Sequence, residues 1–325
     1  MIVLKILITK KLPGKWHERV DLPDYQVIVK PDDQDTRDFI FQNSSDTVGI
    51  LCLLTNKIDK DIIDKLPNLR IISNYAVGFD NIDVEYATKK GICVTNTPGV
   101  LTEASADLTW ALILAARRLV VSADRFTRDG KFKGWEPELF LGYDVYGKTL
   151  GIIGFGRIGQ AVAKRAKGFD MKILYYSRTR DLEAEKALNA GYRDLDLLLK
   201  ESDIVSIHTP LNTQTYHMIT YEKLKLMKPD STIVNTARGK VIKEEDLVRA
   251  LKEGLIFSAG LDVYEFEPDV HPDLLKMENV VLLPHIGSAS FETRTKMAEI
   301  AVTNLVNFIN NKKPVSVVNP EVLNI

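Results

Sequence analysis

Short runs of Val, Ile and Leu alternate with amphipathic stretches along most of the chain. The apolar runs fall at residues 3–9, 27–29, 47–54, 69–73 and 92–95, and again at residues 149–153, 172–176, 204–208, 232–235, 258–261 and 280–283. These runs are apolar on both faces, as buried parallel strands require. Helical patterns such as residues 159–168, 222–226 and 244–253 lie between them. The alternation predicts an α/β fold with two doubly wound, Rossmann-like parallel sheets.

One long apolar stretch, residues 102–119 (TEASADLTWALILAARRL), separates the two series of strands. Thr102, with Ser105 near it, can cap the start of a helix here, and Arg117 and Arg118 suit the negative end of its dipole. Because the stretch is apolar on most sides, we expect the helix to be buried between other elements. A last apolar helix, at residues 291–310, follows the second series and can return to the first domain, which would then be discontinuous.

The composition narrows the class of protein. The chain has 325 residues, enough for about two domains, and 45% hydrophobic residues exclude a disordered chain. With 43 basic and 44 acidic residues, there is no electrostatic case for binding nucleic acid or an anionic membrane. Two cysteines exclude a disulfide scaffold or zinc cluster, and the histidine spacing predicts no metal. No apolar run spans a membrane and the N-terminus reads as a strand, so we expect a cytoplasmic protein.

A glycine motif carries the clearest chemistry. The strand at residues 149–153 runs into Gly154, Gly156 and Gly159, spaced G-x-G-x-x-G, which open a helix. Gly154 allows a tight turn, Gly156 lets the backbone approach a pyrophosphate, and Gly159 lets the helix pack closely on the strand. The helix N-terminus supplies N–H groups for the phosphates. The context therefore predicts a dinucleotide site.

The end of the next strand bears on which dinucleotide binds. An NAD site usually has a carboxylate there, but Ser177 stands 18 positions after Gly159, followed by Arg178 and Arg180. A hydroxyl and guanidinium groups suit a 2′-phosphate, so we expect NADP(H) to be preferred and NAD(H) to remain an alternative. The arginines can also be read as solvated surface charge, and Asp181 lies close.

Polar residues follow three strands of the second series, at the strand ends where ligands bind in open α/β sheets. Arg238 can clamp the carboxylate of a 2-oxo acid, and His285 can donate a proton to the developing alkoxide. Glu267 suits the carboxylate that keeps such an imidazole protonated toward neutral pH. His208 ends another strand at the same face.

With these motifs the sequence resembles the D-isomer-specific 2-hydroxyacid dehydrogenases over nearly its whole length. The matching segments are residues 74–83 (NYAVGFDNID), 96–99 (NTPG), the glycine motif, 236–239 (TARG), 260–263 (GLDV) and 284–287 (PHIG). The resemblance implies that Arg238, Glu267 and His285 are the catalytic set. It implies that Leu53 and the backbone N–H groups of Val77 and Gly78 also bind the substrate.

The resemblance also implies the cofactor contacts and the architecture. The cofactor contacts are Thr102, Gly154, Phe155, Gly156, Arg157, Ile158, Ser177, Arg178, Thr179, Thr209, Pro210, Thr236, Ala237, Asp262, His285 and Gly287. The implied domains are residues 1–99 with 287–325 for the substrate and residues 100–286 for the dinucleotide, with the active site in the cleft between them. A homodimer built around the dinucleotide domain is implied as well.

Within the family, residues 135–143 (WEPELFLGY) and 177–180 (SRTR) resemble glyoxylate/hydroxypyruvate reductases. In that subgroup the loop near Trp135 approaches the partner's active site, although Trp135 can equally pack a dimer. A phosphoglycerate dehydrogenase or another D-2-hydroxyacid dehydrogenase is the alternative enzyme, but only Lys57 offers a cation for a substrate phosphate. An NAD(H)-sensing protein like the transcriptional corepressors of this fold is the non-enzyme alternative.

Overall fold

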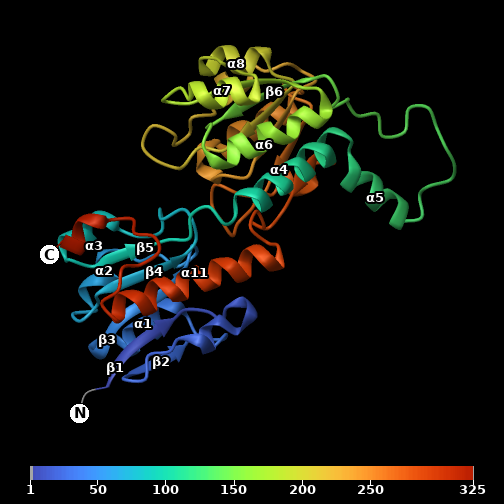
Figure 1. Cartoon of the computed structure of the whole chain (residues 1–325). Coiled ribbons are helices and arrows are strands. Elements are labelled where there is room, and N and C mark those ends of the chain that lie inside the picture. The colour runs from blue at the N-terminus through green and yellow to red at the C-terminus, as the bar shows by residue number, and fades with distance from the viewer. Residues whose placement is uncertain (1–2, 325) are drawn as a thin grey trace. The chain divides into compact units, whose positions relative to one another are not determined.

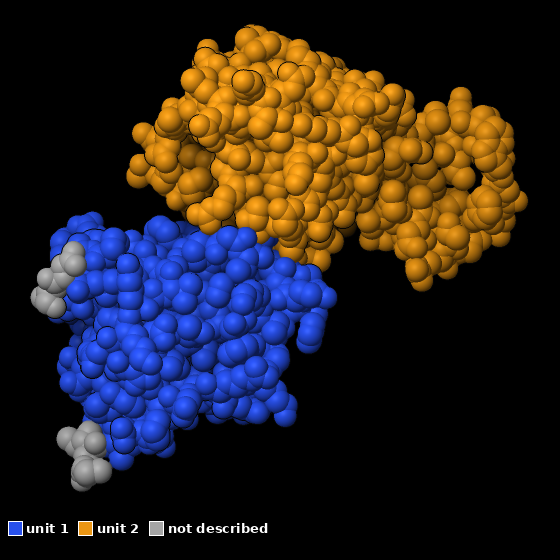
Figure 2. Space-filling model, viewed as in Figure 1, with its two compact units in different colours: residues 1–101, 288–325 blue, residues 102–287 orange. Residues whose placement is uncertain are grey.

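The computed structural model describes residues 3–324, and the chain divides into two compact units. Unit 1 comprises Met1–Leu101 and Ser288–Ile325, and unit 2 comprises Thr102–Gly287 (Figure 2). The chain therefore passes from one unit to the other twice, and helix α11 (Phe291–Ile309) belongs with the N-terminal part of the chain. Which unit serves the substrate and which the dinucleotide stays a prediction at this point.

Unit 1 is built on a five-stranded sheet in which every pairing is parallel. Its order is β2-β1-β3-β4-β5, with strands β1 (Leu4–Ile8), β2 (Tyr25–Val29), β3 (Thr47–Leu53), β4 (Ile71–Tyr75) and β5 (Cys93–Thr95). Its helices are α1 (Thr36–Gln42), α2 (Lys60–Asp64), α3 (Val84–Lys89) and α11 (Phe291–Ile309), with 3-10 turns η1 (Pro13–Arg19), η2 (Ser44–Asp46) and η6 (Pro320–Asn324). Apolar side chains fill both faces of the sheet.

Short polar side chains determine where the unit 1 helices begin. Asp35, Asp59 and Asp83 each accept hydrogen bonds from backbone N–H groups in the first turns of α1, α2 and α3. Ser290 caps α11 in the same way. The long helix α11 then packs on the sheet beside β4 (Figure 1), where Ser73 donates a hydrogen bond of 2.8 Å to the Ala301 carbonyl.

Unit 2 is built on a seven-stranded parallel sheet of order β12-β11-β10-β9-β6-β7-β8. Its strands are β6 (Thr149–Ile153), β7 (Lys172–Tyr176), β8 (Ala190–Tyr192), β9 (Ile204–Ile207), β10 (Thr232–Asn235), β11 (Ser258–Leu261) and β12 (Val280–Leu282). Its helices are α4 (Thr102–Arg117), α5 (Val120–Arg128), α6 (Arg157–Ala166), α7 (Leu182–Leu188), α8 (Leu195–Glu201), α9 (Tyr221–Leu224) and α10 (Glu244–Lys252), with 3-10 turns η3 (Lys167–Phe169), η4 (Gly239–Val241) and η5 (Leu274–Lys276). The strand order reverses at β6, which creates the switch point where such sheets bind ligands. Both units thus have the predicted doubly wound parallel architecture.

The structure corrects the expectation for the helix at residues 102–119. It ends at Arg117, and Leu119, with a φ of 52°, starts a separate helix, α5. One face of α4 is not buried, since Leu114 is exposed. Arg117 is the last residue of α4, as the sequence predicts, but it is fully buried and donates hydrogen bonds to the carbonyls of Asp144, Asp203 and Asp230.

Helix α5 and the following residues 129–144 form an arm that extends from the body of unit 2 (Figures 1 and 2). The arm carries large apolar side chains in solvent: Val120, Val121, Phe132, Trp135, Leu141 and Tyr143 are all exposed, Trp135 by 84%. The Tyr143 N–H donates a hydrogen bond of 3.0 Å to the Arg117 carbonyl, which ties the end of the arm to α4. Monomeric proteins rarely expose so many apolar side chains in one segment.

Candidate active site

The glycine motif forms a narrow turn between β6 and α6 at the switch point. Gly154 has a φ of 94°, and a Cβ added there would lie 2.6 Å from the His208 carbonyl group. A Cβ on Gly159 would lie 2.2 Å from the Gly154 carbonyl oxygen, so this glycine lets α6 start against the strand. A Cβ on Gly156 would meet nothing within 4 Å. The open space at Gly156, beside the N-terminus of a ten-residue helix, fits the pyrophosphate of a dinucleotide.

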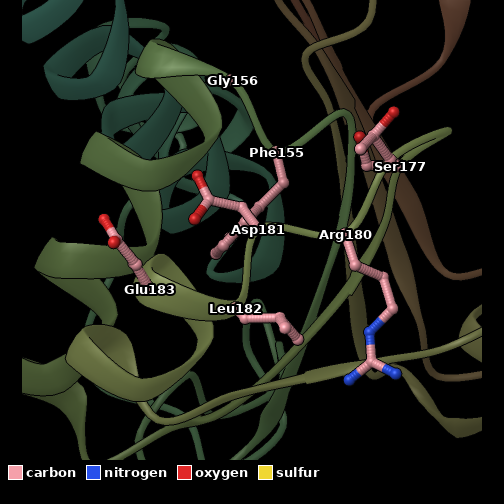
Figure 3. A pocket seen from close by; sticks show the side chains of 8 residues that line it. Phe155, Gly156, Ser177, Arg180, Asp181, Leu182 and Glu183 are labelled. Atoms are coloured by element: carbon pink, nitrogen blue, oxygen red, sulfur yellow. The ribbon is translucent and has the colours of Figure 1, made fainter.

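A cavity of about 540 Å³ lies beside this turn. Its lining combines the turn with the segment after β7 and the start of α7: Phe155, Gly156, Ser177, Thr179, Arg180, Asp181, Leu182 and Glu183 (Figure 3). Phe155 is held by stacking on Tyr175, with ring centroids 4.0 Å apart. Of the residues predicted to contact the cofactor, Phe155, Gly156, Ser177 and Thr179 therefore meet in one cavity. Arg178 is exposed and does not line it, whereas Arg180 does.

The other predicted cofactor contacts lie near the same edge of the sheet. Arg157 and Ile158 are the first residues of α6, and Thr209 follows β9 against Gly154. The Pro210 carbonyl accepts a hydrogen bond from the Thr215 hydroxyl. His208, just before them, bonds the Ser206 hydroxyl at 2.8 Å, and burial lowers the pKa of His208 to about 3. This imidazole is therefore neutral and carries no charge toward a bound dinucleotide.

His285 and Glu267 form the centre of the predicted catalytic set. Their Nδ1 and Oε2 atoms are 2.9 Å apart, and both side chains are about three-quarters buried, at 25% and 30% exposed. Burial alone would raise the pKa of Glu267, but the hydrogen bond and charge of His285, the Tyr264 N–H and the charge of Arg238 lower it below its ordinary value. Glu267 is thus a stable anion, and the bond through Nδ1 leaves Nε2 of His285 as the nitrogen that can exchange a proton.

Asp262 holds the segment that carries His285. This fully buried carboxylate accepts hydrogen bonds of 2.7 Å from the N–H groups of both Ile286 and Gly287. Burial raises the pKa of Asp262, while these two hydrogen bonds and the charge of His285 act in the opposite direction. A Cβ on Gly287 would lie 3.2 Å from Asp262 and 3.7 Å from the Ser105 hydroxyl, so α4, whose first residue is Thr102, begins beside this segment.

Arg238 follows β10 in a turn organised by a buried asparagine. Asn235 donates to the Arg238 carbonyl (2.9 Å) and accepts from the Ala237 N–H (3.0 Å). The hydroxyl of Thr236 bonds that of Thr109 on α4 at 2.9 Å. The Arg238 guanidinium donates a hydrogen bond of 2.8 Å to the Ala237 carbonyl, and its charge helps to lower the pKa of Glu267. The three predicted catalytic residues therefore lie at one edge of the unit 2 sheet.

The predicted substrate-binding residues of unit 1 meet in a cluster of asparagine side chains. Asn81 donates to the Leu53 carbonyl at 3.2 Å, and Asn74 donates to the Gly78 carbonyl at 2.8 Å. Asn96 donates to the Val77 carbonyl at 2.8 Å. Within the described part of the chain, the N–H groups of Val77 and Gly78 donate no hydrogen bond, so both donors can bind an anion.

Neither a candidate metal site nor a membrane-spanning helix is found in residues 3–324. In that range no group of histidine, cysteine or acidic side chains could hold a metal ion. Likewise, no helix there is both long and apolar enough to cross a membrane.

Three residues that shape the site were not predicted individually from the sequence. Asn235, Tyr264 and Gln160 hold the turns through hydrogen bonds to backbone groups, as when the Tyr264 hydroxyl donates to the Leu283 carbonyl at 2.8 Å. Only the position of Asn235 at a strand end hinted at its role.

Comparisons with known proteins agree with this geometry. Residues 110–287 match the model of the D-isomer specific 2-hydroxyacid dehydrogenase, NAD binding domain. A glyoxylate reductase of Thermococcus onnurineus is 51% identical over 99% of this chain and 97% of its own length. The structure of the TT0316 protein of Thermus thermophilus is 43% identical, covers 97% of this chain and 100% of its own, and superposes with a TM-score of 0.90.

A further solved structure is an NADPH-dependent glyoxylate/hydroxypyruvate reductase of Sinorhizobium meliloti, in complex with NADP and malonate. It is 33% identical, the match covers 98% of this chain and 97% of that one, and the TM-score is 0.87. Similarity of this extent, in sequence and in both sheets, means that the chain is an oxidoreductase of the D-isomer-specific 2-hydroxyacid dehydrogenase family.

Proposed function

We propose that this protein reduces glyoxylate, and with it hydroxypyruvate, to the 2-hydroxy acid. The observation that carries the proposal is the hydrogen-bonded His285–Glu267 pair with Arg238 in electrostatic range, on the same sheet edge as the glycine turn. The names of two relatives, the glyoxylate reductase of Thermococcus onnurineus and the glyoxylate/hydroxypyruvate reductase of Sinorhizobium meliloti, point to the same substrate. Unit 1 is then the substrate domain and unit 2 the dinucleotide domain.

Each group has a defined task in the reaction. A reduced dinucleotide held at the glycine turn, at the start of α6, would supply the hydride for the substrate carbonyl carbon. Arg238 binds the substrate carboxylate, with the N–H groups of Val77 and Gly78 as further donors. Nε2 of His285 gives a proton to the carbonyl oxygen as it becomes an alcohol, and Glu267 stabilises the imidazolium that gives it. Hydride plus proton convert the 2-oxo acid into the 2-hydroxy acid, so the charges balance.

The surroundings of Leu53 favour a small, uncharged substrate group over a phosphate. Lys57, the cation that follows β3, has its Nζ 3.6 Å from the carboxylate of Asp59. A substrate phosphate would have to compete with the Asp59 carboxylate for Lys57. A phosphorylated 2-oxo acid therefore fits less well than glyoxylate or hydroxypyruvate.

Turnover by the purified protein tests the function. The values of kcat/KM for glyoxylate, hydroxypyruvate, pyruvate and phosphohydroxypyruvate are measured with NADPH and with NADH. We expect the first two substrates to be preferred, and NADPH to be used at least as well as NADH because Ser177 and two arginines follow β7. Dinucleotide binding without oxidation by any of the four acids would favour the sensor alternative instead.

We also infer that the protein forms a homodimer through the arm and the exposed face of α4. Support comes from the apolar side chains that the arm carries in solvent, with Leu114 on the neighbouring helix. Sedimentation of wild type and a Trp135→Ser, Leu141→Ser variant tests this, since loss of the arm's apolar contacts should produce monomers. A wild-type monomer would contradict the inference.

A further inference from the structure

Arg180, at the cavity beside the glycine turn, already has a carboxylate partner. Its Nε lies 2.9 Å from Oε1 of Glu185 and its Nη2 lies 2.8 Å from Oε2, which is a bidentate ion pair between the segment after β7 and helix α7. Figure 3 shows the Arg180 side chain pointing away from Asp181 and Glu183, the two acids that line the same cavity. The partner of Arg180 is therefore Glu185, which does not itself line the cavity.

Other contacts fix this ion pair in place. The guanidinium of Arg180 lies 5.3 Å over the ring of Tyr192, and the hydroxyl of Tyr175 donates to Oε1 of Glu185 at 2.5 Å. Glu185 is only 15% exposed, whereas Arg180 is 53% exposed. The hydrogen bonds from Arg180 and Tyr175 lower the pKa of Glu185 to about 2, so it is ionised at neutral pH.

The neighbouring acid is engaged differently. Asp181 caps α7 through the Ala184 N–H at 2.9 Å and accepts from Nε2 of Gln160 at 3.1 Å. Nε2 of Gln160 also donates to the carbonyl of Phe155 in the glycine turn. Asp181 is thus tied to the turn and not to Arg180, which leaves Glu185 to balance the charge of that arginine.

We propose that Glu185 is a specificity-determining residue that limits the preference of the site for a dinucleotide with a 2′-phosphate. It does so by neutralising Arg180, a cation at the place where that phosphate would bind. The idea rests on the proposed function only in taking the cavity beside the glycine turn as the cofactor's. Since Tyr192 also holds Arg180, removal of the Glu185 charge should free the arginine for phosphate without displacing it.

Binding of NADP⁺ and NAD⁺ to the whole protein, measured by titration calorimetry, tests the proposal without relying on turnover. Glu185→Gln keeps a hydrogen-bond acceptor for Arg180 and Tyr175 but removes the charge. We expect it to lower the Kd of NADP⁺ about 3- to 10-fold at low salt, with a smaller effect at high salt, and to change the Kd of NAD⁺ less than about 2-fold.

The matched control is Glu183→Gln, which removes the same charge from the cavity lining. A double-mutant cycle with Arg180→Ala separates the two acids. The effect of Glu185→Gln should disappear when Arg180 is absent, because it acts through that residue, whereas any effect of Glu183→Gln should persist. Glu185→Ala removes the acceptor as well and should give a smaller gain than Glu185→Gln.

Three results would overturn the proposal: equal changes for NADP⁺ and NAD⁺, a gain that survives in Arg180→Ala, or weaker NADP⁺ binding in Glu185→Gln. The last would mean that Glu185 mainly positions the arginine. Failure of the proposed function looks different. Both dinucleotides would then bind and respond to Glu185→Gln as expected, while glyoxylate would still not be reduced.

Discussion

The substitutions Gly156→Ala and Gly159→Ala should have different effects: the first should weaken dinucleotide binding, and the second should destabilise the fold. Gly156 has an ordinary φ of −79°, and a Cβ there would meet no protein atom within 4 Å. The free protein should tolerate Gly156→Ala, with a change in Tm of less than about 2 °C, because two small effects oppose each other. Alanine restricts the unfolded chain, which stabilises the fold, but it is a poorer helix N-cap than glycine, which destabilises it.

The same substitution should weaken dinucleotide binding. The space that the methyl group would occupy is the space through which a pyrophosphate reaches the backbone N–H groups at the start of α6. Loss of one hydrogen bond to a charged group costs about 1.5–3 kcal/mol, so the Kd should rise about 10- to 10²-fold. NAD⁺ and NADP⁺ should be affected alike because they share the pyrophosphate.

Gly159→Ala should instead destabilise the fold. An alanine in a helix normally stabilises it by about 1 kcal/mol relative to glycine. Here, however, the Cβ would lie 2.2 Å from the Gly154 carbonyl oxygen and 3.1 Å from a methyl group of Ile152. A backbone oxygen cannot rotate away, so the overlap should cost about 1–3 kcal/mol or more and lower Tm by about 2–4 °C for each net kcal/mol lost.

Differential scanning fluorimetry and calorimetric titration distinguish the two effects in matched variants. If Gly156→Ala bound both dinucleotides as tightly as wild type, the close approach of the pyrophosphate to this glycine would be refuted. If Gly159→Ala kept the wild-type Tm, α6 would have room to move off β6, and the packing argument for this glycine would be wrong.

Three further predictions concern the catalytic set. Arg238→Ala should raise KM for glyoxylate and lower kcat in steady-state assays, because the same cation binds the carboxylate and orients the carbonyl; an unchanged KM would exclude the clamp. His285→Ala should lose about 10²–10⁴ of kcat while calorimetry finds dinucleotide affinity nearly unchanged, and near-normal turnover would remove His285 from the mechanism. Because the pKa of Glu267 is lowered in the folded state, its contribution to stability is present above its ordinary value of about 4.5 and is lost as the pH falls through the folded value. The Tm difference between wild type and Glu267→Gln should therefore shrink between pH 6 and pH 3, and a constant difference would contradict the assigned charge.

The interior of the sheets was predictable because burial on both faces leaves a continuous apolar run. Strands β6, β7, β10 and β11 have the bounds that the sequence predicted. The three-residue edge strand β8 was missed, since its sequence Ala190–Tyr192 has neither length nor an apolar run. Helix α5 was missed because the apolar pattern continues through Leu119, where the backbone turns left-handed for one residue.

Residues of the candidate site were predictable where the backbone itself creates the need for them. Gly154 and Gly159 have no room for a side chain, so the motif that contains them is informative without knowledge of the partners. The interactions of Arg117 were not predictable, because the carbonyls that it binds lie 27, 86 and 113 residues away in the sequence. A guanidinium at a helix end can adopt many solvated conformations, and its buried partners are determined only when the strands and loops around it pack together.

The expected preference for NADP(H) shows why charged residues are harder to interpret than glycines. Two arginines after β7 suggest two cations for a phosphate, but Arg180 is neutralised by Glu185, five residues along the chain. Arg178 is exposed, and within residues 3–324 it forms neither a hydrogen bond nor an ion pair, so it is the cation that a phosphate could recruit at the lower electrostatic cost. The strength of the preference therefore depends less on the number of arginines than on how firmly α7 holds one of them.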